Sequence, residues 1–152
     1  MGQRLGTPIS GNLINCTGVP ASSITGTLPV ANGGTGDTGT AWTAYTPTLT
    51  AASGTYTTAS AAGRYKTIGK TVFIHVTITI TTIGTGTYPK FTLPVSAYDI
   101  EQVNLYGFES IAARTINGRA SAPSSVLVTL YDNSVPVVSG TVCQLAGVYE
   151  ST

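Results

Sequence analysis

The alternation of apolar and polar side chains is clearest between Thr71 and Thr82, where it repeats every two residues. One face of this stretch is entirely apolar and carries Val72, Ile74, Val76, Ile78 and Ile80. The other face carries Phe73, His75, Thr77, Thr79 and Thr81. Because nearly every residue is β-branched or aromatic, the pattern predicts a long β-strand. Its apolar face should contact a core, and its other face is free to contact solvent or a second subunit.

Shorter alternating runs predict further strands, giving seven or eight in all. They lie at Trp42–Thr50, around Tyr56, and at Arg64–Ile68, Phe91–Leu93, Leu105–Ile116, Val126–Tyr131 and Thr141–Tyr149. Turn signals separate them at Gly69-Lys70, Gly84-Thr85-Gly86, Asn117-Gly118 and Asp132-Asn133-Ser134. Pro47 places the first run at a sheet edge or a bulge, and residues 96–104 fit either a helical turn or a loop. This spacing predicts an all-β fold, an antiparallel β-sandwich or jelly-roll-like domain.

Residues 1–40 follow a different pattern, rich in Gly, Pro, Thr and Asn, with Arg4 and Asp37 as their only charged side chains. Such a segment cannot build a core, yet it is too apolar in places for a solvated tail. We therefore expect an extended attachment arm over 1–40, followed by a β-domain over 41–152. The residues expected to contact a receiving surface are Leu5, Ile9, Leu13, Ile14, Val19, Ile24, Leu28 and Val30.

The composition narrows the classes of function. Charged residues make up 9% of the chain, against roughly 25% in an average globular protein, and the net charge is +1. Without a basic patch, nucleic-acid binding has little support. No stretch reaches 18 consecutive apolar residues, so no membrane span is expected, and the N-terminus lacks the apolar region of a secretory signal. These features predict a protein made in a cytoplasm.

Two glycine motifs superficially match nucleotide-binding sequences. Residues 34–39 fit G-x-G-x-x-G, but the following residues, 40–47, do not form a helical pattern. Residues 63–71 resemble a phosphate loop with one residue too many between the glycines, and they lead into the long strand. We therefore expect a turn between two strands there, and no cofactor.

The residues that usually bind metals or form disulfides are sparse. His75 is the only histidine, and we expect a half-buried strand residue beside Phe73, although three copies around a threefold axis would bring three imidazoles together. The two cysteines, Cys16 and Cys143, have no metal-motif spacing. Two buried thiols are the simpler interpretation, and a disulfide between them stays open.

Few residues are candidates for catalysis or for sugar binding. The six carboxylates are scattered, and we interpret them as solvated loop charges. Asp99 and Glu101 alone are close enough in sequence to suggest a glycan hydrolase, which needs two carboxyls about 5–10 Å apart. Five tyrosines near predicted strand ends either stack on sugars or pack in the core or a subunit interface: Tyr45, Tyr56, Tyr88, Tyr98 and Tyr106.

Several segments resemble a known family of virion proteins. Residues 6–11, 13–20 and 28–36 resemble the linker segments of tailed-bacteriophage fibre and head-decoration proteins. Residues 42–47, 63–66, 68–70, the long strand and 92–94 resemble the β-domain at the end of such proteins. The resemblance covers residues 6–95 and leaves 96–152 without a counterpart.

The resemblance implies homotrimers that are attached at one end and carry no catalytic activity. We accordingly expect a trimeric capsid-decoration or head-fibre protein of the virion, bound to capsid or tail subunits through its arm. The alternative is a tail fibre or tail tip that recognises host surface glycans. Residues expected to contact a trimer neighbour or a glycan are Phe73, His75, Tyr45, Tyr98 and Tyr106.

Overall fold

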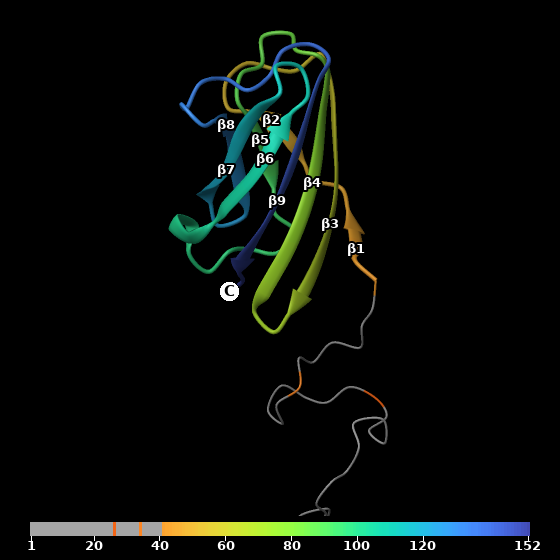
Figure 1. Cartoon of the computed structure of the whole chain (residues 1–152), viewed down its shortest axis with the longest axis vertical. Coiled ribbons are helices and arrows are strands. Elements are labelled where there is room, and N and C mark those ends of the chain that lie inside the picture. Colours follow the sequence, from red (N-terminus) through yellow and green to blue (C-terminus); the bar gives the residue numbers. More distant parts are fainter. Residues whose placement is uncertain (1–25, 27–33, 35–40) are drawn as a thin grey trace, which may run out of the picture.

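The computed structural model describes Gly26, Gly34 and residues 41–152 (Figure 1). The predicted arm falls almost wholly outside the described residues. The same holds for all eight of its predicted contact positions: Leu5, Ile9, Leu13, Ile14, Val19, Ile24, Leu28 and Val30.

Nine antiparallel strands form one sheet, in the order β1-β3-β4-β9-β6-β7-β8-β5-β2. Their bounds are β1 Thr43–Tyr45, β2 Leu49–Ala51, β3 Thr58–Ile68, β4 Thr71–Thr82, β5 Pro89–Thr92, β6 Asn104–Glu109, β7 Arg114–Ala122, β8 Ser125–Leu130 and β9 Thr141–Glu150, with a 3₁₀ turn, η3, at Ile100–Gln102. The all-β antiparallel class is thus confirmed. The strands make one continuous curled sheet, a half-barrel, rather than two separate stacked sheets.

The curl follows from how the first two strands are connected. β1 pairs with β3 at one edge of the sheet, and β2 pairs with β5 at the other edge. A flat sheet of nine strands would hold its edges about 38 Å apart. Only residues 46–48 join β1 to β2, and such a link spans about 14 Å at most. The two edges must therefore curl toward each other, with Pro47 buried between them.

The core lies inside this curl and is built on β4. All five apolar residues of its predicted buried face are almost fully buried, from 0% to 2% exposed, which confirms the period-two interpretation. They pack with buried side chains from five other strands: Phe91, Leu105, Ile116, Val126, Val128, Cys143 and Leu145. On the opposite face Phe73 is half-buried, whereas His75 is exposed to solvent, so its predicted half-burial is wrong.

The predicted strand over Leu105–Ile116 is wrong, because β6 ends at Glu109 and β7 begins at Arg114. The intervening turn carries no Gly or Pro signal. The buried Glu109 carboxylate forms it, accepting hydrogen bonds from the backbone N–H groups of Ile111 and Ala112 at 2.9 and 3.0 Å. Ala113 takes the left-handed conformation with φ 56°. Asn117 and Gly118, predicted as a turn, lie inside β7.

The single strand predicted over Trp42–Thr50 is wrong, because residues 46–48 separate β1 from β2, whereas most of the predicted turns agree with the structure. The stretch 63–71 is a strand hairpin that turns at Gly69, whose φ is +60°, so no helix follows it. The turn at Asp132-Asn133-Ser134 is confirmed, with Ser134 donating its backbone N–H to the Asp132 carboxylate. Residues 96–104 contain the 3₁₀ turn η3. The predicted strand around Tyr56 is absent, because β3 begins only at Thr58.

Candidate functional site

A groove of about 750 Å³ crosses the outward face of the sheet over β3, β4, β9 and β6. Backbone register explains its shape, because Arg64, His75, Ala146 and Tyr106 lie side by side on these four consecutive strands. The second row is Ala62, Thr77, Gln144 and Phe108. In the first row the small Ala146 thus leaves a hollow between the larger His75 and Tyr106. Two strand spacings separate His75 from Tyr106, a width of about 10 Å.

One side of the groove is an aromatic and cationic cluster beside β1. The rings of Trp42 and His75 meet edge to face, with centroids 5.1 Å apart. The Arg64 guanidinium carbon lies 5.3 Å from the Trp42 ring centroid, in cation–π range. These contacts hold three side chains from three different segments in fixed positions at the edge of the groove.

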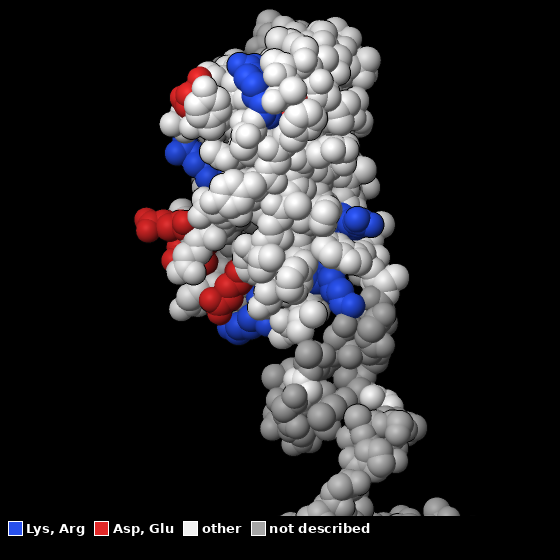
Figure 2. Space-filling view, in the orientation of Figure 1, with Lys and Arg blue, Asp and Glu red and all other residues white. Residues whose placement is uncertain are grey.

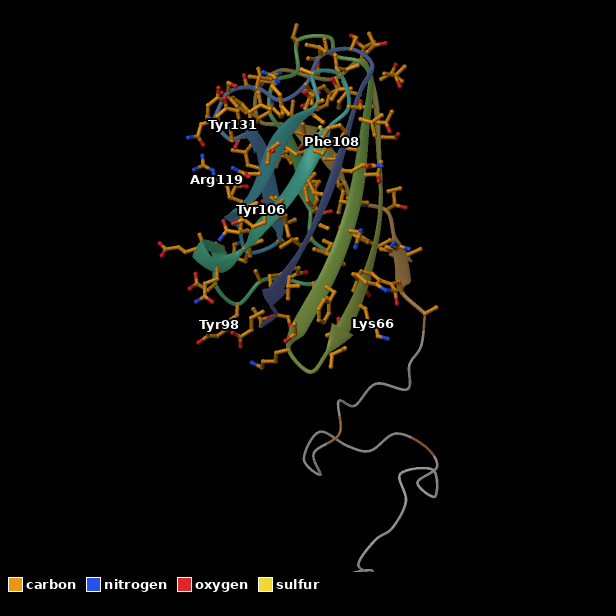
Figure 3. The ribbon with its side chains drawn as sticks, in the orientation of Figure 1. Lys66, Tyr98, Tyr106, Phe108, Arg119 and Tyr131 are labelled. Carbon is orange, nitrogen blue, oxygen red and sulfur yellow. The ribbon has the colours of Figure 1, made fainter. Side chains whose placement is uncertain are left out.

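The opposite side is formed by β6, where Tyr106 and Phe108 both point outward (Figure 3). Tyr106 is 62% exposed and Phe108 is 45% exposed, which is high for rings of this size. Val148 lies on the same face and is also exposed. In Figure 2 the charged side chains lie mainly at the margins of the face in view, and its centre is uncharged.

The structure brings together three of the five residues predicted to contact a trimer neighbour or a glycan. Phe73, His75 and Tyr106 share the outward face, where Phe73 pairs with Val148. Tyr45 packs toward the core against Tyr65, with ring centroids 5.7 Å apart.

Tyr98 also lies away from the groove, near η3. The Lys70 ammonium group is 5.7 Å from the Tyr98 ring centroid. Sequence reasoning missed Trp42, Arg64, Phe108 and Gln144 as groove residues. The alternating pattern in β3 and β6 predicts which side chains face outward. Only the order of the strands in the sheet places these outward faces on one surface.

The predicted carboxylate pair has a structural role. The Asp99 carboxylate accepts hydrogen bonds from the Glu101 backbone N–H at 2.9 Å and from the Gln102 side-chain amide at 3.1 Å. Asp99 thereby caps the first turn of η3. These bonds do not place Asp99 and Glu101 across a cleft.

Glu109 is not a solvated loop charge, and that prediction is wrong for this residue. Its side chain is 1% exposed and forms an ion pair with Arg114, with Nε 3.3 Å from Oε1. Burial raises the pKa of the Glu109 carboxyl. The backbone N–H of Ile111, the Arg114 side chain and further backbone donors lower it more, so the pKa lies below its ordinary value.

Residues 41–152 contain neither a metal-binding cluster nor a helix able to span a membrane. This part of the chain contains no group of three or more His, Cys, Asp or Glu side chains able to hold a metal ion. Cys143 is buried, as expected, whereas Cys16 lies outside the described residues, so the alternative of a disulfide between them stays open. Among the helices that the structure describes, none has the length and apolar character to cross a membrane.

Searches of protein-family models, curated proteins and solved structures returned no match to this chain. Its function must therefore be inferred from the groove, the fold and the sequence.

Proposed function

We propose that this chain is a non-enzymatic structural protein of a bacteriophage virion. Three copies associate through their β-domains and decorate the capsid. Residues 1–40 of each copy bind neighbouring virion proteins. The proposal rests on the segments of residues 6–95 that resemble virion proteins and on the exposed aromatic face of the β-domain.

The observation that carries the proposal is the uncharged aromatic face of β4, β9 and β6. Tyr106, Phe108 and Val148 are exposed there, and Phe73 is half-buried between them and β3. Contiguous apolar surface on a small soluble domain is typical of a contact site. Burying such surface between copies would contribute about 25 cal/mol for each Å². This gain would supplement a core built from only about 110 residues.

Removal of residues 1–36 tests whether the arm binds the particle while the β-domain alone forms the trimer. The shortened chain should still sediment as a trimer but should no longer join assembled particles. The double variant Tyr106→Ser and Phe108→Ser keeps residues 1–36 but loses two rings of the contact face. It should dissociate into monomers. Tyr131→Ser, which removes an exposed ring outside the groove, is the matched control. Full incorporation of the shortened chain, or a wild-type protein that is monomeric at micromolar concentration, would refute the proposal.

A second candidate function, recognition of a host surface glycan, is favoured by the groove itself. His75, with the Trp42 ring against it, stands on one side, and Tyr106 stands on the other, about 10 Å from His75. Aromatic faces of this kind stack on the apolar faces of sugar rings. The side chains of Arg64 and Gln144 can donate hydrogen bonds to sugar hydroxyls.

A pair of tyrosine variants separates the two functions. Tyr106→Ala should abolish binding of the purified protein to host cells or to arrayed glycans if the groove binds sugar. Tyr131→Ala removes an equally exposed ring, 69% accessible, at the end of β8 and outside the groove, and should leave binding intact. Equal binding by both variants would reject the glycan function.

A further inference from the structure

The edge of β3 is only partly covered. Within the described residues, β1 pairs with Gly63, Arg64 and Tyr65, whereas Thr58–Ala62 pairs with β4 alone. After Tyr45 the chain leaves β3 and continues through Pro47 into β2 on the other sheet edge. Over five residues of β3, the backbone groups that point away from β4 therefore have no strand partner in this part of the chain.

A groove of about 520 Å³ lies beside this free edge. β2 and the start of β3 form its two sides, and residues 54–57 close one end. Within the described residues, β2 pairs with β5 alone, so its second edge is also without a strand. Two backbone edges thus border one groove, at the point where the curled sheet stops short of closing.

Apart from one bulge at its first two residues, the free edge carries none of the features that usually prevent strand addition. Natural edges are protected by charged side chains, by proline or by bulges. Thr58–Ala62 reads Thr-Ala-Ser-Ala-Ala, with small side chains and no charge. The bulge in β3 lies between Thr58 and Ala59, at the margin of this stretch. The residues lining the groove are also uncharged: Leu49, Thr50, Ala51, Gly54, Thr55, Tyr56, Thr57, Thr58 and Ala59. An uncharged, extended segment is the ligand that this edge fits.

We propose that a stretch of residues 1–25 from a second copy adds to β3 as an extra strand along Thr58–Ala62. These 25 residues contain one charged side chain, Arg4, so their neutrality matches the groove. Main-chain hydrogen bonds would supply the affinity, as in other cases of strand addition. The proposal rests on the self-association proposed above and assigns part of the arm to binding a neighbouring copy.

The direction of β1 favours a second copy over the same chain. Thr43 pairs with Tyr65 and Tyr45 with Gly63, so the chain enters β1 from the Ile68 end of β3. The free edge lies beyond the other end of β1. A segment of the same chain would have to reverse and run back past β1, whereas a neighbour's segment can approach directly.

Disulfide trapping between two labelled forms of the full-length chain tests the proposal. One form carries Ser60→Cys together with Cys16→Ser, and the isotopically heavy form keeps Cys16 as its only cysteine in residues 1–25. Ser10→Cys and Ser22→Cys, each combined with Cys16→Ser, replace the heavy form in parallel to sample other registers. Oxidation of the mixture should link position 60 to at least one of these positions between light and heavy chains. The yield should be at least tenfold above that of Ser124→Cys, the control in the exposed turn between β7 and β8. Links confined to one chain, or a yield equal to the control in every register, would overturn the proposal.

Hydrogen exchange gives a second test. It distinguishes a failure of strand addition from a failure of self-association. In protein that light scattering shows to be associated, amides of residues 58–62 that point away from β4 should exchange at least tenfold more slowly than in Ser60→Lys. Ser124→Lys adds the same charge in the exposed turn between β7 and β8 and should keep the protection. Unprotected amides in an associated wild-type protein would refute strand addition alone, whereas a protein that never associates would refute the proposed function as well.

Discussion

The ring of Tyr45 lies directly over Gly63, and a Cβ atom at position 63 would stand 2.3 Å from Cε1 of that ring. The two residues are register partners in β1 and β3. Glycine at position 63 therefore allows the short edge strand β1 to cover the end of the core. Alanine would force the ring away, since real carbon atoms do not approach so closely.

Gly63→Ala should lower the free energy of unfolding by about 1–3 kcal/mol, the usual cost of overpacking. Urea unfolding measures the loss, and near-ultraviolet circular dichroism should show a changed tyrosine environment. Gly69→Ala is the control, because its Cβ would meet nothing within 4 Å and only its φ of +60° carries strain. The control should cost about 1–2 kcal/mol with no spectral change. An unchanged tyrosine spectrum in Gly63→Ala would contradict the packing described.

Removal of two buried tyrosine hydroxyls should have opposite effects. The Tyr45 hydroxyl is buried and has no hydrogen-bond partner among the described residues, and burial raises its pKa above the ordinary value. The Tyr149 hydroxyl donates to the Val95 carbonyl at 2.7 Å. Tyr149→Phe should therefore cost about 1 kcal/mol in urea unfolding, whereas Tyr45→Phe should be neutral or stabilising. A larger loss for Tyr45→Phe than for Tyr149→Phe would indicate that the Tyr45 hydroxyl has a partner.

Glu109→Gln should reduce stability in a pH-dependent way. The carboxylate accepts backbone N–H groups in the turn between β6 and β7, and the pKa of Glu109 is lowered in the folded protein. A lowered folded pKa stabilises the protein above the unfolded value of about 4.3. That contribution is lost as the pH falls from there through the folded pKa.

Urea unfolding of wild type and Glu109→Gln between pH 7 and pH 2.5 checks this dependence. The difference should be about 1–3 kcal/mol at pH 7 and should shrink below pH 4.3. Glu101→Gln, which removes an exposed carboxylate, is the matched control and should change stability little at any pH. A difference for Glu109→Gln that stays constant with pH would show that the charge itself does not hold the turn.

The Cys143 thiol should be unreactive in the folded protein. Burial and, to a smaller extent, the nearby Glu109 charge raise the pKa of Cys143 to about 12, so little thiolate exists at pH 8. In a Cys16→Ser background, Ellman's reagent should modify Cys143 only as fast as the protein unfolds. Adding 6 M urea should make the reaction rapid, and fast modification without denaturant would contradict the burial.

The period-two pattern of Thr71–Thr82 was sufficient to predict β4 and its buried face, because nearly every residue in it favours a strand. The same alternation predicted the bounds of β8 and β9 to within a residue or two of those in the structure. The turn after Glu109 escaped prediction for a physical reason. A buried carboxylate satisfies the backbone of that turn, and a lone glutamate in a sequence gives no sign that it will be buried.

The alternating pattern by itself determined that this chain forms antiparallel strands with one apolar face, because strand propensity and periodicity are local properties. The order of those strands is not local. Only the tertiary structure placed β1 and β2, three residues apart, on opposite edges, and so curled the sheet around its core. The same long-range pairing placed β9 and β6 beside the β3–β4 hairpin, and so brought Tyr106 onto one groove with Arg64 and His75.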